Sequence, residues 1–120
     1  MSELRQQIEN VIQSEDVALF MKGTHQFVMC GNSSRALEAL RDAGAPVTTV
    51  DVLPDPRIRQ ELSAISSWPT IPQVFVRGEL IGGADIVEEL EQSGELEKTL
   101  REKLGEVYRS EERVVVVAAA

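Results

Sequence analysis

The 120 residues contain one cysteine, and the side chains around it are the first candidates for chemistry. Cys30 stands between an apolar run at residues 17–21, which predicts a buried strand, and residues 33–40, whose spacing predicts a helix. The first N–H groups of a helix have no partners within it, and the helix dipole is positive there, so a thiolate is stabilised. Lys22 is expected to return through the loop and add a positive charge. The sequence therefore predicts a reactive or ligating thiol.

An ordinary buried cysteine is the alternative, because free cysteines often behave as small hydrophobic residues. Residues 31–34 are Gly, Asn, Ser and Ser, which are poor core formers and good helix starters. This composition places the sulfur near the surface and favours the reactive thiol.

Composition excludes several classes of function. The chain has 20 acidic and 12 basic residues, a net charge of −8, which argues against a nucleic-acid or anionic-membrane binder. No apolar run approaches membrane-spanning length and the N-terminus does not resemble a signal peptide, so we expect a soluble cytoplasmic protein. One cysteine excludes an internal disulfide and a Cys-rich zinc site, and it fits a reducing compartment.

The apolar spacing predicts five helices and four strands, which must position the thiol. Helices are expected at about residues 4–12, 33–43, 56–65, 85–91 and 96–107, and strands at residues 17–21, 47–52, 73–76 and 79–81. The first two strands enclose a helix, which predicts a parallel pair, and Arg77-Gly78 predicts an antiparallel hairpin. The predicted fold class is α/β, with a mixed four-stranded sheet covered by helices on both faces.

No linker divides the chain. Residues 1–104 are predicted to form a single domain, and residues 105–120 a C-terminal tail of uncertain structure. The valine run at residues 114–117 leaves three alternatives open: pairing at a sheet edge, docking elsewhere, or an exposed association-prone segment.

Four motifs carry a resemblance to a known family. They are Phe-Met-Lys-Gly-Thr at residues 20–24, Met-Cys-Gly-Asn-Ser at 29–33, Trp-Pro-Thr-Ile-Pro-Gln at 68–73 and Gly-Glu-Leu-Ile-Gly-Gly-Ala-Asp-Ile at 78–86. Together they resemble the monothiol, CGFS-type glutaredoxins of the thioredoxin-fold superfamily, over roughly residues 16–104. The resemblance implies a thioredoxin-like glutaredoxin fold with a variant Cys-Gly-Asn-Ser motif.

The resemblance also implies a site. In that family glutathione lies across the site, and its thiol and the active cysteine of each of two subunits hold one [2Fe–2S] cluster. Cys30 would then be both the catalytic thiol and the metal ligand. The residues implied to bind glutathione are Lys22, Cys30, Arg59, Ile71, Pro72, Ala84 and Asp85.

Each of these residues has an implied role. Lys22 would face the thiolate or the glycine carboxylate of glutathione, and Arg59 would contact that carboxylate. Ile71, before a cis-Pro72, would pair its backbone with the cysteine of glutathione. The N–H of Ala84 and the carboxylate of Asp85 would hold the γ-glutamyl end. Outside the family pattern, Lys22 and Arg59 are as well explained as solvated cations, and Asp85 as a helix cap.

The sequence departs from the family at five positions: His25 and Val28 replace prolines, Asn32 replaces a phenylalanine, Ser63 a basic residue and Ala84 a second cysteine. His25 is expected to be a solvated loop residue and not an iron ligand. These departures bear on how firmly a cluster and glutathione are held.

Three functions fit these observations. The first is a glutathione-binding protein that carries or senses a [2Fe–2S] cluster as a homodimer, with BolA-like and iron–sulfur assembly proteins as partners. The second is a weak glutathione-dependent thiol–disulfide oxidoreductase, an enzyme that removes glutathione from proteins; whether the chain is an enzyme is left open. The third is a thioredoxin-fold interaction module that has lost the cluster.

Overall fold

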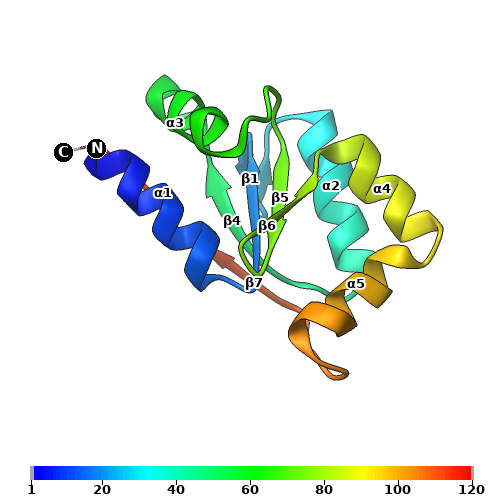
Figure 1. The fold of residues 1–120 in the computed structure, drawn as a ribbon. Coiled ribbons are helices and arrows are strands. Elements are labelled where there is room, and N and C mark those ends of the chain that lie inside the picture. The colour runs from blue at the N-terminus through cyan, green and yellow to red at the C-terminus, as the bar shows by residue number, and fades with distance from the viewer. Residues whose placement is uncertain (1, 120) are drawn as a thin grey trace.

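The computed structural model describes residues 2–119, which form a mixed sheet with helices on both faces (Figure 1). The elements are α1 (Glu3–Ser14), β1 (Val17–Met21), β2 (Gly23–Thr24), β3 (Phe27–Val28), α2 (Gly31–Asp42), β4 (Pro46–Asp51), α3 (Pro56–Ser66), β5 (Gln73–Val76), β6 (Glu79–Gly82), α4 (Ala84–Gln92), α5 (Glu95–Leu104) and β7 (Glu111–Val114). The predicted α/β class is confirmed, with five helices at the expected places.

The main sheet has the strand order β6-β5-β1-β4-β7. The central strand β1 is parallel to β4 and antiparallel to β5, as the sequence predicted. All five residues of β1 are buried, because helices cover both of its faces. The β5–β6 hairpin turns at Arg77 and Gly78, whose φ angles of 49° and 82° lie in the left-handed region that such tight turns need.

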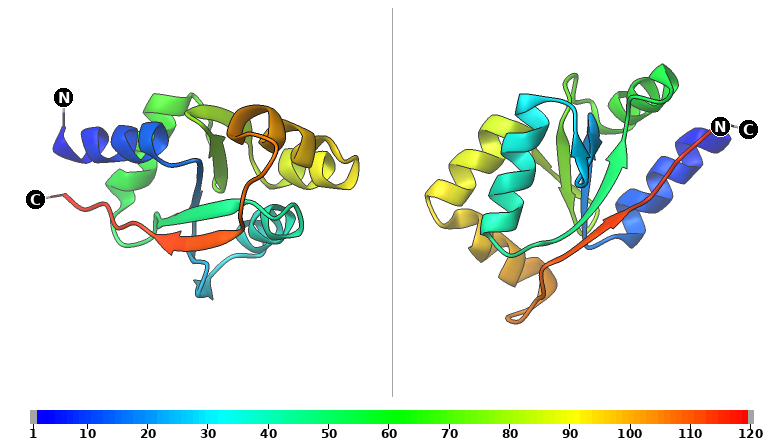
Figure 2. Two further views of the ribbon diagram at one scale, coloured as in Figure 1. Left: turned by 90° about the horizontal axis from the view of Figure 1, so that it is seen from below. Right: turned by 180° about the vertical axis from the view of Figure 1, so that it is seen from behind.

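Two helical layers enclose the sheet. Helices α1 and α3 lie on one face, and α2, α4 and α5 lie on the other (Figures 1 and 2). Successive side chains of a strand point to opposite faces, so Leu19 joins the core with Leu40 and Leu100, whereas Phe20 joins the core with Ile8. These two cores fix β1, and with it the start of the segment that leads to Cys30.

The C-terminal tail adds a fifth strand to the four that the sequence predicted. β7 pairs parallel with β4, and the N–H of Val115 continues the ladder by donating to the carbonyl of Thr49 at 3.0 Å. Val117 is then buried against the α1 and α3 side of the sheet. Edge pairing, one of the three alternatives for the tail, therefore occurs, but through Glu111–Val114.

The two ends of the described chain lie side by side (Figures 1 and 2). The side-chain amide of Gln7 donates to the carbonyl of Ala118 at 2.8 Å, and the N–H of Ala118 donates back to the Gln7 amide oxygen at 3.1 Å. Ser2 and Ala119 line the same small hollow. The tail is thus joined to the first helix as well as to the sheet.

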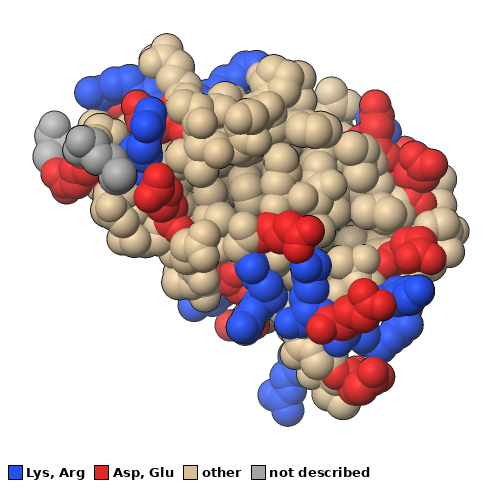
Figure 3. All heavy atoms as spheres, viewed as in Figure 1, with Lys and Arg blue, Asp and Glu red and all other residues tan. Residues whose placement is uncertain are grey.

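The charges are spread over the surface. Basic and acidic side chains alternate along the lower edge of the face in Figure 3, and its upper middle, between α3 and α4, is without charge. No helix within residues 2–119 is both long and apolar enough to cross a membrane.

Candidate thiol site

Cys30 is the N-cap residue of α2, which begins at Gly31, slightly earlier than the sequence predicted. Its φ and ψ of −153° and 138° are extended, so the chain changes from loop to helix at the thiol itself. The backbone N–H of Ser33 is the main cause that lowers the pKa of the Cys30 thiol. Partial burial opposes this shift, and the N–H of Asn32 and the charge of Lys22 add to it. The structure thus favours the thiolate.

Ser33 and Lys22 connect the start of α2 to the end of β1. The Ser33 hydroxyl is buried and accepts a hydrogen bond from the backbone N–H of Lys22 at 3.1 Å. The carbonyl of Lys22 accepts from the N–H of Met29 at 3.0 Å, which closes the loop. Lys22 thereby lies near enough to Cys30 for its charge to act on the thiol, as the sequence predicted.

The loop before Cys30 contains a small hairpin, β2–β3, that the sequence did not predict. Gly23 has a φ of +95°, and a Cβ there would lie 2.2 Å from the carbonyl oxygen of Phe27, so glycine is required. The N–H of Gly23 donates to the carboxylate of Asp51 at 3.0 Å, which fixes the hairpin to the end of β4. Phe27 and Met29, two apolar residues of the segment that leads to the thiol, are 72% and 55% exposed.

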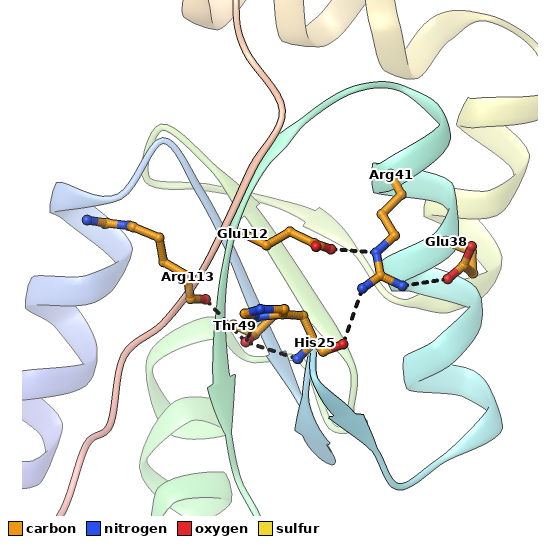
Figure 4. A network of polar contacts seen from close by, with 6 residues as sticks. All are labelled: His25, Glu38, Arg41, Thr49, Glu112 and Arg113. Atoms are coloured by element: carbon orange, nitrogen blue, oxygen red, sulfur yellow. Dashed lines mark hydrogen bonds and ion pairs between the residues drawn. The ribbon is translucent and has the colours of Figure 1, made fainter.

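His25 is half-buried in the turn of this hairpin (Figure 4). Its N–H donates to the Thr49 hydroxyl at 3.3 Å, and its carbonyl accepts from Arg41 at 3.2 Å. Arg41 is itself held by Glu38 at 2.8 Å and by Glu112 of β7 at 2.5 Å. That His25 is solvated and not an iron ligand stays a prediction; the contacts of its backbone show that Thr49 of β4 and Arg41 of α2 hold this turn.

Two grooves flank the thiol. The first, called here the Lys22 groove, has a volume of about 530 Å³ and contains Arg59 and Ser63 of α3 in its lining. The second, the Asp85 groove, has a volume of about 420 Å³. Its lining includes four further predicted residues and two from α2: Ile71, Pro72, Ala84, Asp85, Asn32 and Arg35.

The loop of residues 67–72 lines the Asp85 groove. Arg59 donates to the carbonyl of Pro69 at 3.4 Å, which ties α3 to this loop. The buried side chain of Gln73 donates to the carbonyls of Trp68 and Thr70 at 3.0 and 3.1 Å. The Ile71–Pro72 peptide bond is cis, as the resemblance implied.

Gly83 lets α4 approach this loop. A Cβ at this position would lie 3.2 Å from the Pro72 carbonyl and 3.4 Å from the Trp68 indole nitrogen. Gly83 is also the N-cap of α4, so Asp85 does not cap the helix. The N–H groups of the first turn of a helix have no partners within it. The N–H groups of Ala84 and Asp85 belong to this first turn of α4, and both residues line the Asp85 groove.

Six of the seven predicted residues line one of the two grooves, and the seventh, Cys30, lies in the chain between Lys22 of the first groove and Asn32 of the second. The structure also brings in Arg35, which the sequence-based interpretation missed. Arg35 donates to the Asp85 carboxylate at 2.8 Å and to the Asn32 side-chain oxygen at 3.1 Å. The i, i+3 spacing of Asn32 and Arg35 was a visible signal, but their link to Asp85 required the packing of α2 against α4.

Comparison with known proteins identifies the family. The Glutaredoxin family model matches residues 17–81. A probable monothiol glutaredoxin 2 of Rickettsia typhi is 45% identical over 96 residues, which cover 80% of this chain and 86% of that protein. A monothiol glutaredoxin of rice, Oryza sativa, is 48% identical over 99 residues, or 82% of this chain, but the match spans only 20% of its length. The chain belongs to the glutaredoxin family.

Solved structures agree with this assignment. The solution structure of reduced poplar apo GrxS14 has a TM-score of 0.75 at 40% identity, and the match covers 84% of this chain and 93% of that chain. A buckwheat glutaredoxin in complex with glutathione has a TM-score of 0.73 at 27% identity, covering 85% and 91% of the two chains. The predicted thioredoxin-like glutaredoxin fold is confirmed.

Proposed function

We propose that this protein is a monothiol glutaredoxin that binds glutathione and, as a homodimer, a [2Fe–2S] cluster, which it carries or senses. The observation that carries the proposal is one activated thiol, Cys30, between two grooves whose linings include opposite charges. Lys22 and Arg59 supply positive charge on one side, and Asp85 supplies a carboxylate on the other. Glutathione is a tripeptide with a glycine carboxylate at one end and a γ-glutamyl amine and carboxylate at the other, so its charges match this arrangement.

In this proposal each groove receives one end of the tripeptide. Lys22 and Arg59 bind the glycine carboxylate, and the first N–H groups of α4 bind the γ-glutamyl carboxylate, because a helix N-terminus favours anions. The backbone of Ile71, held by Pro72, pairs with the central cysteine as an added strand would. The bound thiol then lies beside Cys30. The buckwheat complex supports a glutathione site in this fold.

The chemistry of the donor set fits a shared cluster. Iron–sulfur clusters are held mainly by thiolates, and each chain has only Cys30 to offer. Among the residues that the structure describes, no group of three His, Cys, Asp or Glu side chains is placed to hold a metal ion. The remaining ligands must therefore come from glutathione and a second copy of the chain. We propose BolA-like and iron–sulfur assembly proteins as partners, and the cytoplasm as the compartment.

Anaerobic reconstitution with iron and sulfide tests this proposal. The wild-type protein should gain visible absorption and iron only when glutathione is present, and should elute as a dimer. Cys30→Ser should remain folded and gain neither, whereas Ser34→Ala, a similarly small change on the next turn of α2, should behave like the wild type. Stoichiometric cluster in a monomer, or in Cys30→Ser, would refute the shared site.

The lowered pKa of Cys30 also favours a second function, glutathione-dependent reduction of mixed disulfides. The Cys30 thiolate would attack the glutathione sulfur of a glutathionylated protein and release the protein thiolate. A second glutathione thiolate would then attack the Cys30–glutathione disulfide, which releases glutathione disulfide and regenerates Cys30. Ser33 stands where a second, resolving cysteine would be needed for another route. Turnover without reconstituted cluster, lost in Cys30→Ser, would establish this activity.

A further inference from the structure

The C-terminal tail contacts two residues that lie next to the β2–β3 hairpin. β7 pairs with β4 at the edge of the sheet, and the contacts of its side chains and backbone are drawn in Figure 4. Glu112 accepts from Arg41 of α2 at 2.5 Å, and the carbonyl of Arg113 accepts from the buried hydroxyl of Thr49 at 3.3 Å. The tail therefore has one partner on α2 and one on β4.

Both partners also contact His25, at the turn of the hairpin. Arg41 donates to the His25 carbonyl at 3.2 Å through Nη2, while its Nε donates to Glu112. The Thr49 hydroxyl accepts from the His25 N–H at 3.3 Å and lies 3.5 Å from the Nδ1 atom of the ring. A proline in place of His25 would have no N–H to donate. Two separate links thus join the tail to this turn.

The hairpin determines how the chain reaches the thiol. Residues 22–30, called here the thiol loop, contain strands of only two residues each, and so short a hairpin has little stability of its own. The N–H of Met29 donates to the carbonyl of Lys22 at 3.0 Å and closes the loop one residue before Cys30. The contacts at the turn therefore help to keep Lys22 and Cys30 near each other.

We propose that the C-terminal tail orders the thiol loop, with Arg41 and Thr49 as the positioning residues. While β7 is paired with β4, the tail orients the guanidinium of Arg41 and the hydroxyl of Thr49, and both hold the turn at His25. When the tail leaves β4, the turn loses this support and the thiol loop opens. The tail is thus a control on the thiol that is built into the fold, and the link holds whichever ligand the two grooves bind.

The alternative is that these contacts only fasten the tail to the rest of the protein. Two amides distinguish the roles. The N–H of Val115 donates to the Thr49 carbonyl at 3.0 Å and reports the attachment of the tail, whereas the N–H of Met29 reports the closure of the thiol loop. Contacts that only fasten the tail change hydrogen exchange at Val115 alone. Contacts that position the loop change exchange at Met29.

Hydrogen exchange followed by NMR in the full-length protein tests the link from the side of the tail. Glu112→Gln should speed exchange at the Met29 amide by about twofold or more, the range for a partly exposed ion pair, because Arg41 is then held by Glu38 alone. Arg41→Gln should have at least this effect, and adding Glu112→Gln to it should change nothing further, since the link passes through Arg41. Glu111→Gln is the matched control, because neighbouring side chains of a strand point to opposite faces.

Thr49 tests the second link. Thr49→Val keeps the shape of the side chain but removes the hydroxyl, so exchange at Met29 should rise. Thr49→Ser keeps the hydroxyl and should restore the wild-type rate. Thr48→Val is the control: the neighbouring hydroxyl donates to Glu15 at 2.7 Å, and its loss should leave Met29 unchanged. Each rate is compared with those of the β1 amides in the same variant, which report global unfolding.

The outcome decides between the two roles. Faster exchange at Met29 in Glu112→Gln and Thr49→Val, with wild-type rates in both controls, supports the proposal. If exchange rises only at Val115, the contacts fasten the tail and do not position the thiol loop. If neither amide changes, or if Glu111→Gln and Thr48→Val have the same effect as their partners, the link through Arg41 and Thr49 does not exist.

Discussion

At the scale of single residues, the reactivity of Cys30 depends on the groups that stabilise the negative charge of its thiolate. The N–H groups at the start of α2 and the charge of Lys22 lower the pKa of the thiol. The folded state is therefore stabilised by the thiolate at pH values above the pKa of the unfolded thiol. This contribution is lost as the pH falls through the lower pKa of the folded protein.

Alkylation by iodoacetamide as a function of pH measures this shift, because only the thiolate reacts readily. The midpoint for the folded wild-type protein should lie below that for the same protein in urea. Lys22→Gln should move the midpoint to higher pH, because it removes one of the favourable charges. Lys98→Gln, an exposed lysine of α5, should leave it unchanged. Equal midpoints in the folded and unfolded protein would contradict an activated thiol.

The sequence predicted the thiol, its position at a helix start and the approach of Lys22, because these depend on neighbouring elements. It could not predict the Arg35–Asp85 ion pair, whose members are 50 positions apart and meet only when α2 packs against α4. The backbone contacts of His25 with Thr49 of β4 and Arg41 of α2 likewise join segments far apart in the chain, so no local pattern predicts them.

At the scale of elements, the strands that were predicted are the buried ones and β6, which is partly exposed but follows the hairpin signal at Arg77-Gly78. β1 and β5 consist of buried residues, so their apolar runs are visible in the sequence. β7 begins Glu-Glu-Arg and all four of its residues are exposed, as suits the edge of a sheet. β2 and β3 have two residues each, too few for any alternation to be detected. The division of the chain after residue 104 stays a prediction.

Val117 tests how firmly the tail is attached. It is 4% exposed, whereas the neighbouring Val116 is 79% exposed, so the two form a matched pair. Val117→Ala removes two buried methyl groups and should lower the free energy of unfolding by about 1.5 kcal/mol in urea denaturation. Val116→Ala should stay within about 0.5 kcal/mol of the wild type. If the two variants lose equal stability, the tail does not pack as described.

At the scale of the whole molecule, the candidate site lies at one end of the sheet. The carboxyl ends of the parallel strands β1 and β4 lead into the hairpin and the Lys22 groove, and the loop before β5 lines the Asp85 groove. Helices α2 and α4 both begin there, so their positive ends converge on the same region. That these motifs gather around one site was implied by the resemblance to the family and not by their order along the chain.

The hydrogen bonds between Gln7 and Ala118 hold the two ends of the described chain together. The ends could therefore be joined, and the chain opened elsewhere, without changing where the helices and strands lie. A short glycine-rich linker could join the two ends, and new ends could be opened at Ser93 and Gly94, which are exposed between α4 and α5. This circular permutant should unfold cooperatively and keep the pH profile of Cys30 alkylation. A permutant opened between Thr70 and Ile71 should fold less stably and lose glutathione binding, because that cut lies in the lining of the Asp85 groove. Loss of the folded state in the first permutant would show that α4 and α5 must be continuous for the helical layer to form.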